Sequence, residues 1–437
     1  MLKYIYLSMK YSTPFFAGFH RILFGRAPRA GQEDLRDQLK TMQQASLCQL
    51  GKLCKAWVPA KLLEPAMHGA NSRRRLYPTY ITFWAFLSQV MSPGTACREA
   101  VRKIQAWYAS RGRPVPDSGT SAYCQALSRL GHEQLRSIFQ HTATTLERQT
   151  GSDQLWNACE VKVVDGTGVS MPDTPKNQKI WPQSSSQTKG CGFPIATLAG
   201  CFSLASGALL GWAEGSLRIH ERRLFQRLDH LFCAGDIAMT DRGFCSFGSI
   251  ATLLGKGVDT LMRLHQARSV DFRKGKRLGR KDRLVQWHKP RQRDKGISKR
   301  QWKKLPQTLS LRLLHIQITV PGFRPESIIV VTTLIDPIAY PAEQIAELYL
   351  RRWSVELFFR DIKITLGMDV LRCLSPEMVR KEIILHAIVY NLIRGLMLQA
   401  AVLYVLDLSR ISFKGTVDTL RQWMELDRDA ARTKPAG

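Results

Sequence analysis

One stretch of the chain places a carboxylate among cations on a single helical face. Residues 341–366 have the apolar spacing of a helix, in which successive residues rotate by about 100°. Five polar residues then share an arc of about 80°: Tyr349, Arg352, Glu356, Arg360 and Lys363. Such a face suits phosphoryl transfer on a polyanion, because cations can hold phosphates while a carboxylate binds a metal ion. The same charges would also suit a solvated helix face with ion pairs.

Two aspartates follow predicted strands at glycine-containing turns. Asp165 follows an apolar run at 161–164, and Asp241 follows one at 237–240. A lone aspartate before glycine is more often a turn residue than a site. Two of them at neighbouring strand ends, with Glu356 on a helix packed on the same sheet, would form a cage for Mg²⁺ or Mn²⁺. Two such ions can clamp the attacking and leaving oxygens of a phosphodiester.

These residues resemble the signatures of the DDE transposases of bacterial insertion sequences, in the family named after insertion sequence four. That family carries the signature Y-x2-R-x3-E-x6-K. The chain matches every spacing of it, with Tyr349, Arg352, Glu356 and Lys363. Asp165 in DGT and Asp241 in TDRGF match the contexts of the family's first two catalytic aspartates. The resemblance covers residues 160–370 firmly and the region before them more loosely.

The resemblance implies an RNase H-like core with a β-rich insertion between its fifth strand and the helix that bears the last acid. Asp165, Asp241 and Glu356 would then be catalytic and hold two Mg²⁺ or Mn²⁺ ions. Four residues would contact DNA phosphates near the cleaved end: Tyr349, Arg352, Arg360 and Lys363. In the family, an insertion-domain tryptophan can stack on a base flipped from the transposon end. Trp302 is the first candidate and Trp287 the second, and packing is the alternative role for either.

The resemblance also implies a function. The chain would be a cut-and-paste transposase that binds the terminal inverted repeats of its own insertion sequence. Water would free a 3′-OH, which would attack further phosphodiesters through a hairpin and then target DNA. Two ends require two protomers, so we expect a homodimer on double-stranded DNA, in the bacterial cytoplasm at the nucleoid and away from membranes. Two alternatives remain, namely an inactive remnant that represses by occupying the ends, and a nuclease without strand transfer.

The strands and helices that must position these residues can be predicted from the sequence pattern. They indicate an α/β fold with a mixed sheet. Strands are expected at 161–164, 195–202, 208–212, 237–240, 258–264 and 328–334. Helices are expected at 220–232 and 247–256, with His220 as a cap, and then at 341–366. The order β-β-β-α-β-α-β fits a mixed sheet covered by helices.

Composition, apolar periodicity and charge divide the chain into six predicted regions. They are a poorly ordered leader (1–40), a helical N-terminal DNA-binding domain (41–150), the first part of the core (151–265), a basic β-rich insertion (266–325), the last strand and Glu-bearing helix of the core (326–370) and a helical C-terminal region (371–437). Helices are expected at 80–91, 97–108, 120–130 and 133–146. The segment 118–130 is a candidate recognition helix, with packing or dimer contact as the alternative.

The charge balance points to a polyanionic partner. The chain has 64 Lys and Arg against 35 Asp and Glu, a net charge of +29. Residues 266–304 hold sixteen Lys and Arg and three Asp, a net +13. A charge run is usually a solvated loop. Interleaved tryptophans, and an alternating strand with an expected bulge at 309–320, favour a folded insertion that contacts nucleic acid.

Two further patterns exclude other classes. Ten cysteines without a C-x-x-C pair argue against zinc ribbons and disulfide frameworks. The longest apolar stretch, 383–405, carries His386, Asn391 and Arg394, which a membrane span rarely tolerates. We therefore expect a core helix there.

Overall fold

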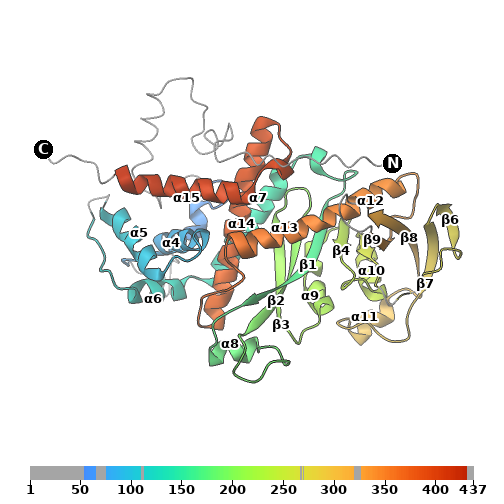
Figure 1. Ribbon diagram of the computed structural model, residues 1–437, viewed down its shortest axis with the longest axis horizontal. Helices are drawn as coiled ribbons and strands as arrows, with labels where there is room; N and C mark the ends of the chain where they lie inside the picture. The colour runs from blue at the N-terminus through green and yellow to red at the C-terminus, as the bar shows by residue number, and fades with distance from the viewer. Residues whose placement is uncertain are drawn as a thin grey trace. The chain divides into compact units, whose positions relative to one another are not determined.

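The computed structural model describes residues 54–64, 75–109, 113–265, 268, 270–318 and 326–430, without the side chains of Glu326 and of 422–430. The predicted leader at 1–40 lies outside these residues. The chain divides into two compact units. An α/β unit comprises Thr150–Arg360 and Leu374–Pro376. A helical unit comprises the described parts of Met1–Gln149, Asp361–Cys373 and Glu377–Gly437 (Figure 1).

A mixed sheet forms the centre of the α/β unit. In the described residues it has nine strands in the order β3-β2-β1-β4-β5-β9-β8-β7-β6. The first five are β1 (Val161–Ser170), β2 (Ile195–Ser203), β3 (Leu209–Ser216), β4 (Ile237–Thr240) and β5 (Asp259–Arg263). β1 pairs antiparallel with β2, and β2 with β3, whereas β1, β4 and β5 run parallel. This is an RNase H-like arrangement, so the predicted fold class is confirmed.

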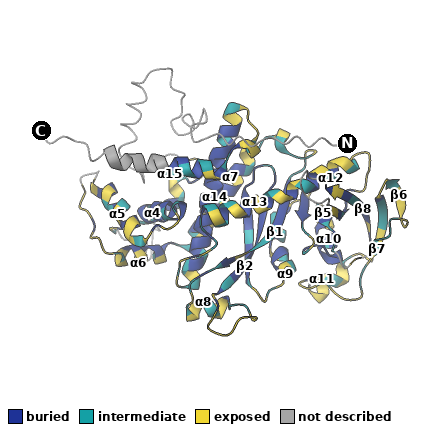
Figure 2. Ribbon diagram, viewed as in Figure 1, coloured by how far each residue is buried: buried dark blue, intermediate teal, exposed yellow. Residues whose placement is uncertain are grey.

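The helices predicted at 220–232 and 247–256 are present between the strands, and a further short helix between β1 and β2 was not predicted. They are α8 (Pro175–Ile180), α9 (Glu221–Arg227) and α10 (Phe247–Leu254), with 3-10 turns η2 (Ser152–Gln154) and η3 (Asp229–Leu231). The Nδ1 atom of His220 accepts a hydrogen bond from the amide of Arg222, so His220 is the N-cap of α9 as predicted. All four residues of β4 are buried, and Figure 2 shows the central strands as the buried layer of the unit. Continuous apolar runs are typical of such parallel strands.

The basic segment continues this sheet. It contains β6 (Lys276–Gly279), β7 (Asp282–His288), α11 (Lys299–Lys304) and β8 (Thr308–Ile318), and β9 (Glu326–Thr332) follows. β9 pairs with β5 on one side and β8 on the other, so the insertion is hydrogen-bonded to the core sheet. The expected bulge at 309–320 is wrong within the described part of that stretch, because β8 pairs without a register shift. The alternation is broken by consecutive buried residues, Leu311–Leu314.

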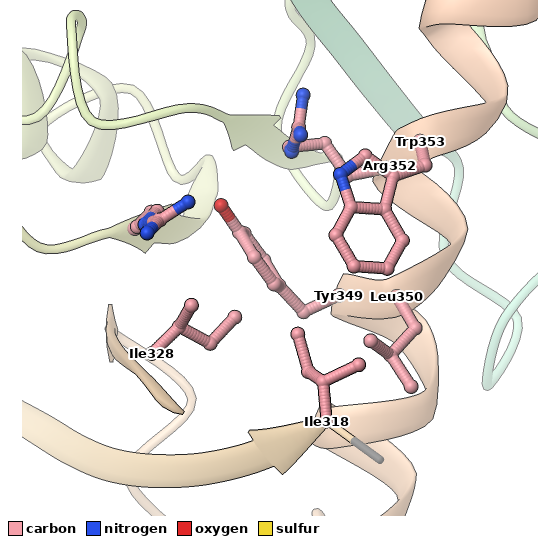
Figure 3. Close-up of a pocket in the computed structure, with 7 residues that line it drawn as sticks. Ile318, Ile328, Tyr349, Leu350, Arg352 and Trp353 are labelled. Atoms are coloured by element: carbon pink, nitrogen blue, oxygen red, sulfur yellow. The ribbon is translucent and has the colours of Figure 1, made fainter. Parts of the chain in front are cut away.

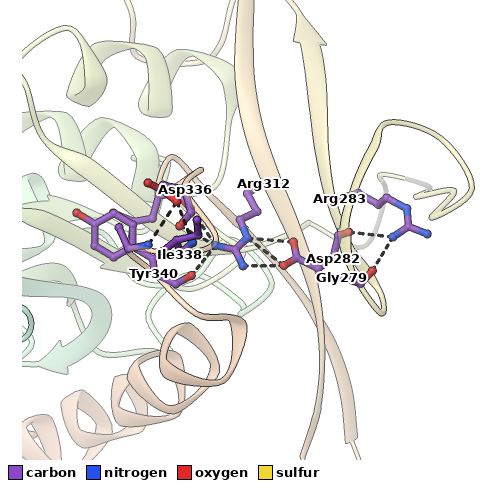
Figure 4. Close-up of polar contacts among 9 residues, drawn as sticks. Gly279, Asp282, Arg283, Arg312, Asp336, Ile338 and Tyr340 are labelled. Carbon is purple, nitrogen blue, oxygen red and sulfur yellow. Dashed lines mark hydrogen bonds and ion pairs between the residues drawn. The ribbon is translucent and has the colours of Figure 1, made fainter.

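Arg312 accounts for much of that break. Its side chain is 1% exposed in the middle of β8, where Nη2 lies 2.6 Å from Oδ2 of Asp282 on β7. Nη1 donates to the backbone oxygen of Tyr340 at 2.7 Å (Figure 4). One guanidinium therefore joins two insertion strands to the loop that precedes the next helix. The same loop has the turn predicted at Asp336, whose Oδ1 accepts from the amide of Ile338.

The helical run expected at 341–366 changes type along its length. α12 (Ala342–Leu350) is followed by the 3-10 turn η4 (Arg351–Trp353), then α13 (Ser354–Arg360) and the π-helical turn η5 (Asp361–Thr365). The expected long helix is therefore confirmed as a continuous helical run, but the apolar pattern did not predict its 3-10 and π-helical turns. η4 coincides with the buried Arg352, and η5 adds one residue to the turn that contains Lys363.

The helical unit confirms the predicted N-terminal helices. It contains η1 (Ala60–Leu63), α4 (Thr79–Met91), α5 (Cys97–Ala109), α6 (Ser121–Arg129), α7 (His132–Gln149), α14 (Pro376–Tyr404), η6 (Leu408–Arg410) and α15 (Phe413–Ala430). α14 is long and apolar enough to cross a membrane by composition, but 94% of its most apolar window is buried inside the protein. It bonds other helices through polar groups, as in Lys381 Nζ to the Ser128 oxygen at 2.6 Å. This burial agrees with the predicted core helix.

Replacing Arg312 with Met should destabilise the protein by about 3–5 kcal/mol, because Asp282 would stay buried without its counter-charge. Urea unfolding measures the change. The double variant Arg312→Met/Asp282→Leu should regain most of the loss, since it removes both charges. Arg273→Met serves as the control, because its ion pair with Asp271 is on the surface. Equal losses in Arg312→Met and Arg273→Met would contradict the assignment.

Candidate active site

Parallel pairing brings the two predicted aspartates together. Val164 on β1 lies opposite Thr240 on β4, so Asp165 and Asp241 occupy the next positions of adjacent strands. β4 ends there, whereas β1 continues and pairs Asp165 with Gly200 of β2. Asp241 therefore follows the end of β4 as predicted, but the prediction that Asp165 ends its strand was wrong, because pairing with β2 extends β1 to Ser170. Strand register places Asp165 beside Asp241.

Aromatic packing fixes α13 on this part of the sheet. The rings of Phe358 and Phe359 lie 5.5 and 5.1 Å from the ring of Phe202 on β2. A Cβ atom on Gly200 would lie 3.0 Å from the Phe359 ring, so the glycine permits the close approach. α13 also packs against β1, which places Glu356 near Asp165.

Arg352 joins these acids. Its side chain is buried, with Nη2 3.2 Å from Oε1 of Glu356 and Nη1 3.5 Å from Oδ2 of Asp165. Burial alone would lower the pKa of Arg352, but the nearby Tyr349, Asp241 and Asp165 outweigh it and raise the pKa above its usual range. The guanidinium is therefore held as a permanent cation among three carboxylates.

Burial and neighbouring carboxylates increase the proton affinity of Asp165. Burial, with Asp241 and Glu356 nearby, raises the pKa of Asp165 from 3.8 to about 6, although the Gly166 amide and Arg352 act in the opposite direction. The Gly166 amide donates to Oδ1 of Asp165 at 2.8 Å. Arg352 and the Gly166 amide thus offset only part of the effect of burial on Asp165.

The residues present fit a divalent metal ion. Oδ1 of Asp241 is buried and has no hydrogen-bond partner, although the chain carries a net charge of +29. Carboxylate oxygens are the ligands that Mg²⁺ and Mn²⁺ prefer. Within the described ranges, no three His, Cys, Asp or Glu side chains already lie close enough to enclose an ion. Side-chain rotation of the exposed Glu356 would be needed to close such a cage.

A small pocket opens beside Arg352. Figure 3 shows Tyr349 pointing from α12 across this pocket, between Arg352 and Ile328. The Tyr349 hydroxyl donates to the Thr240 oxygen at 3.5 Å, and burial raises the pKa of the phenol. The full lining is Arg263, Ile318, Ile328, Tyr349, Leu350, Arg352 and Trp353.

Arg263 is a pocket residue that the sequence analysis missed. It ends β5, and because Thr240 of β4 lies opposite Met262, it occupies the position beside Asp241. Asp165, Asp241 and Arg263 therefore follow one another across three parallel strands. The sequence signal that could have identified Arg263 is its position as a charged residue at the end of the apolar run that forms β5.

The other predicted residues fall outside this cluster. Arg360 is the exposed last residue of α13. Lys363 lies in η5, which groups with the helical unit. Trp302 packs edge-on to Phe247 of α10, with ring centroids 6.2 Å apart, and Lys289 Nζ lies 5.5 Å from its ring. Trp287 lies under the guanidinium of Arg268, 4.0 Å from the ring centroid.

Comparison with known proteins identifies the class. The family described as "Transposase DDE domain" matches residues 158–392, more than half of the chain. The chain therefore belongs to the DDE transposases, enzymes that act on DNA and generally use divalent metal ions. It is 24% identical over 331 residues to the transposase InsG for insertion sequence element IS4 of Escherichia coli (strain K12), which covers 75% of this chain and 72% of that protein. The expected membership of the insertion sequence four family is confirmed.

The raised pKa of Asp165 makes a pH-dependent prediction for the protein in EDTA. Folded Asp165 releases its proton near pH 6, but unfolded Asp165 does so near its usual 3.8. The folded state thus binds the extra proton between these values, and stability falls as pH rises through this window. Asp165→Asn should be more stable than the wild type by about 3 kcal/mol at pH 7 and equally stable below pH 4. Urea titrations across pH 4–7 measure this difference, and a pH-independent difference would refute it.

Proposed function

We propose that this protein moves its own insertion sequence by cut-and-paste transposition. The observation that carries the proposal is the placement of Asp165, Asp241 and Glu356 around the buried guanidinium of Arg352. These residues stand in the contexts of the family's acids and arginine. Catalysis would comprise strand nicking, a hairpin at the transposon end and transfer of the freed end to target DNA.

We assign metal binding to Asp165, Asp241 and Glu356, with two Mg²⁺ or Mn²⁺ ions. When bound, the ions would supply charge stabilisation at the attacking and leaving oxygens of the phosphodiester. Arg352 would hold a phosphate oxygen through N–H groups beyond those that contact the carboxylates. Tyr349 supports Arg352 from the pocket, and Arg263 adds a second guanidinium there.

DNA binding outside the pocket is proposed from charge. Exposed cations cover the insertion: Arg273, Lys274, Lys276, Arg277, Arg280, Lys281, Arg291, Arg293, Lys295, Lys299, Arg300, Lys303 and Lys304. Such side chains contact phosphates without reading sequence. Arg360 and Lys363 would contact phosphates in the same way. The helical region at 41–150, with α6 as its recognition helix, would bind the terminal inverted repeats.

Assembly and location follow from the same proposal. Two transposon ends must be brought together, so a homodimer on double-stranded DNA would form the synaptic complex. The protein would act in the bacterial cytoplasm at the nucleoid.

Cleavage of a duplex carrying the element's own end tests the proposal. That end can be taken from inverted repeats in the DNA that flanks the gene. Asp165→Asn and Glu356→Gln should each bind the duplex like the wild type but lose cleavage by more than about 100-fold, because a metal ligand is lost. Glu343→Gln, on the exposed side of α12, is the matched control and should cleave normally. Binding without cleavage by the wild type would instead support a repressor.

Trp302 yields a separate prediction. Trp302→Leu keeps an apolar contact with Phe247 but removes the ring on which a flipped base would stack. We expect normal end binding and nicking with a reduced yield of hairpin, measured on denaturing gels. Trp287→Leu should leave the hairpin yield unchanged. The reverse pattern would transfer the role to Trp287, and two unaffected variants would assign both rings to packing.

A further inference from the structure

A fourth carboxylate lies against glycines that follow each of the two aspartates. Glu221 is the first residue of α9. A Cβ atom on Gly166, directly after Asp165, would lie 3.3 Å from Oε1 of Glu221. One on Gly243, two residues after Asp241, would lie 2.9 Å from Oε2. The glycines therefore leave the space that the Glu221 carboxylate occupies between the two turns.

The backbone at the start of α9 is held in this position. Nε of Arg222 donates to the backbone oxygen of Gly243 at 3.1 Å, and Nη2 donates to that of Cys245 at 3.5 Å. Phe225, one turn further along α9, packs its ring 5.5 Å from the ring of Phe244. Polar and apolar contacts thus fasten α9 to the turn that follows β4, so the nearness of Glu221 to Asp241 is built into the fold.

The carboxylate of Glu221 makes no stabilising polar contact with the described residues. In the part of the chain that the structure describes, it has neither a hydrogen bond nor an ion pair. The neighbouring Asp241 has its buried Oδ1 without a partner as well. Unneutralised carboxylates beside one another are costly, and 64 Lys and Arg residues were available to pair with them. Such an arrangement suits a cation that is not part of the chain.

We propose that Glu221 is a fourth acidic residue of the active site and supplies a carboxylate oxygen to the divalent ion held by Asp165 and Asp241. The inference rests on the proposed function and deepens it, because the metal site gains a ligand that lies in none of the three matched motifs. Glu221 is exposed and has a flexible side chain, so a carboxylate oxygen can turn toward an ion while the carboxylate stays beside the glycines. A hard cation with several oxygen ligands accepts such a donor.

Binding of Mn²⁺ to the full-length, EDTA-treated protein, followed by electron paramagnetic resonance without DNA, tests the proposal. Glu221→Gln keeps the shape of the side chain but loses its charge, and it should bind Mn²⁺ about 10-fold more weakly. Glu343→Gln is the matched control, since Glu343 is also an exposed acid in the first turn of a helix of the same unit. It should bind Mn²⁺ like the wild type.

A second variant moves the carboxylate without removing it. Gly243→Ala would place a methyl group 2.9 Å from Oε2 of Glu221, which must shift away. Gly243 does not have a positive φ, so the backbone tolerates alanine. Weaker Mn²⁺ binding should result here too, and raised Mn²⁺ should restore cleavage by both variants.

The outcomes separate this inference from the proposed function. Wild-type Mn²⁺ affinity in Glu221→Gln, with lost affinity in Asp165→Asn, would overturn the role of Glu221 and leave the three-acid site standing. Unchanged affinity in Asp165→Asn would overturn the metal site itself. Equal weakening in Glu221→Gln and Glu343→Gln would assign the effect to general helix charge and also overturn the role of Glu221.

Discussion

Burial and mutual repulsion of carboxylates are the constraint on which this candidate site depends. Asp165, Asp241 and Glu356 lie near one another, and the buried guanidinium of Arg352 is the described cation that contacts two of them. Burial, with the other two acids nearby, raises the pKa of Asp165 in spite of Arg352. The packing of Phe358 and Phe359 on Phe202 holds the acids together against this repulsion. The hydrophobic effect thus supplies the free energy that keeps an electrostatically unfavourable site assembled, ready for cations and phosphates.

The sequence was sufficient for the parts of the fold and site that local patterns encode. Apolar runs predicted the core strands, and fixed spacings predicted Tyr349, Arg352 and Glu356. Features set by tertiary contacts were not predictable. The 3-10 turn at Arg352 and the burial of Arg312 at 1% exposure arise from partners far along the chain. Arg263 lies beside Asp241 through strand register, and Glu221 lies beside Gly166 and Gly243 through the docking of α9, which the sequence pattern of α9 alone does not report.

Hydrogen bonds between strands join the insertion to the core sheet. β8 is bonded to β9 over seven residue pairs, from Arg312 to Ile318, and β9 is bonded to β5. Arg312 adds a buried contact from the insertion to Tyr340, just before α12. Strands that carry the basic surface are therefore rigidly connected to the helix that presents Tyr349. A force on the insertion would be transmitted to β5, which ends at Arg263, through the hydrogen bonds of the sheet.

The pairing of β5 with β9 also has a consequence for synthesis on the ribosome. β5 ends at Arg263, and its neighbour begins only at Glu326, about sixty residues later. A nascent chain must expose the unpaired edge of β5 until that partner emerges, and such edges recruit other chains. The segment made in the interval contains the strongly basic stretch, net +13 over residues 266–304. Its self-repulsion would keep neighbouring nascent chains apart while the sheet is incomplete.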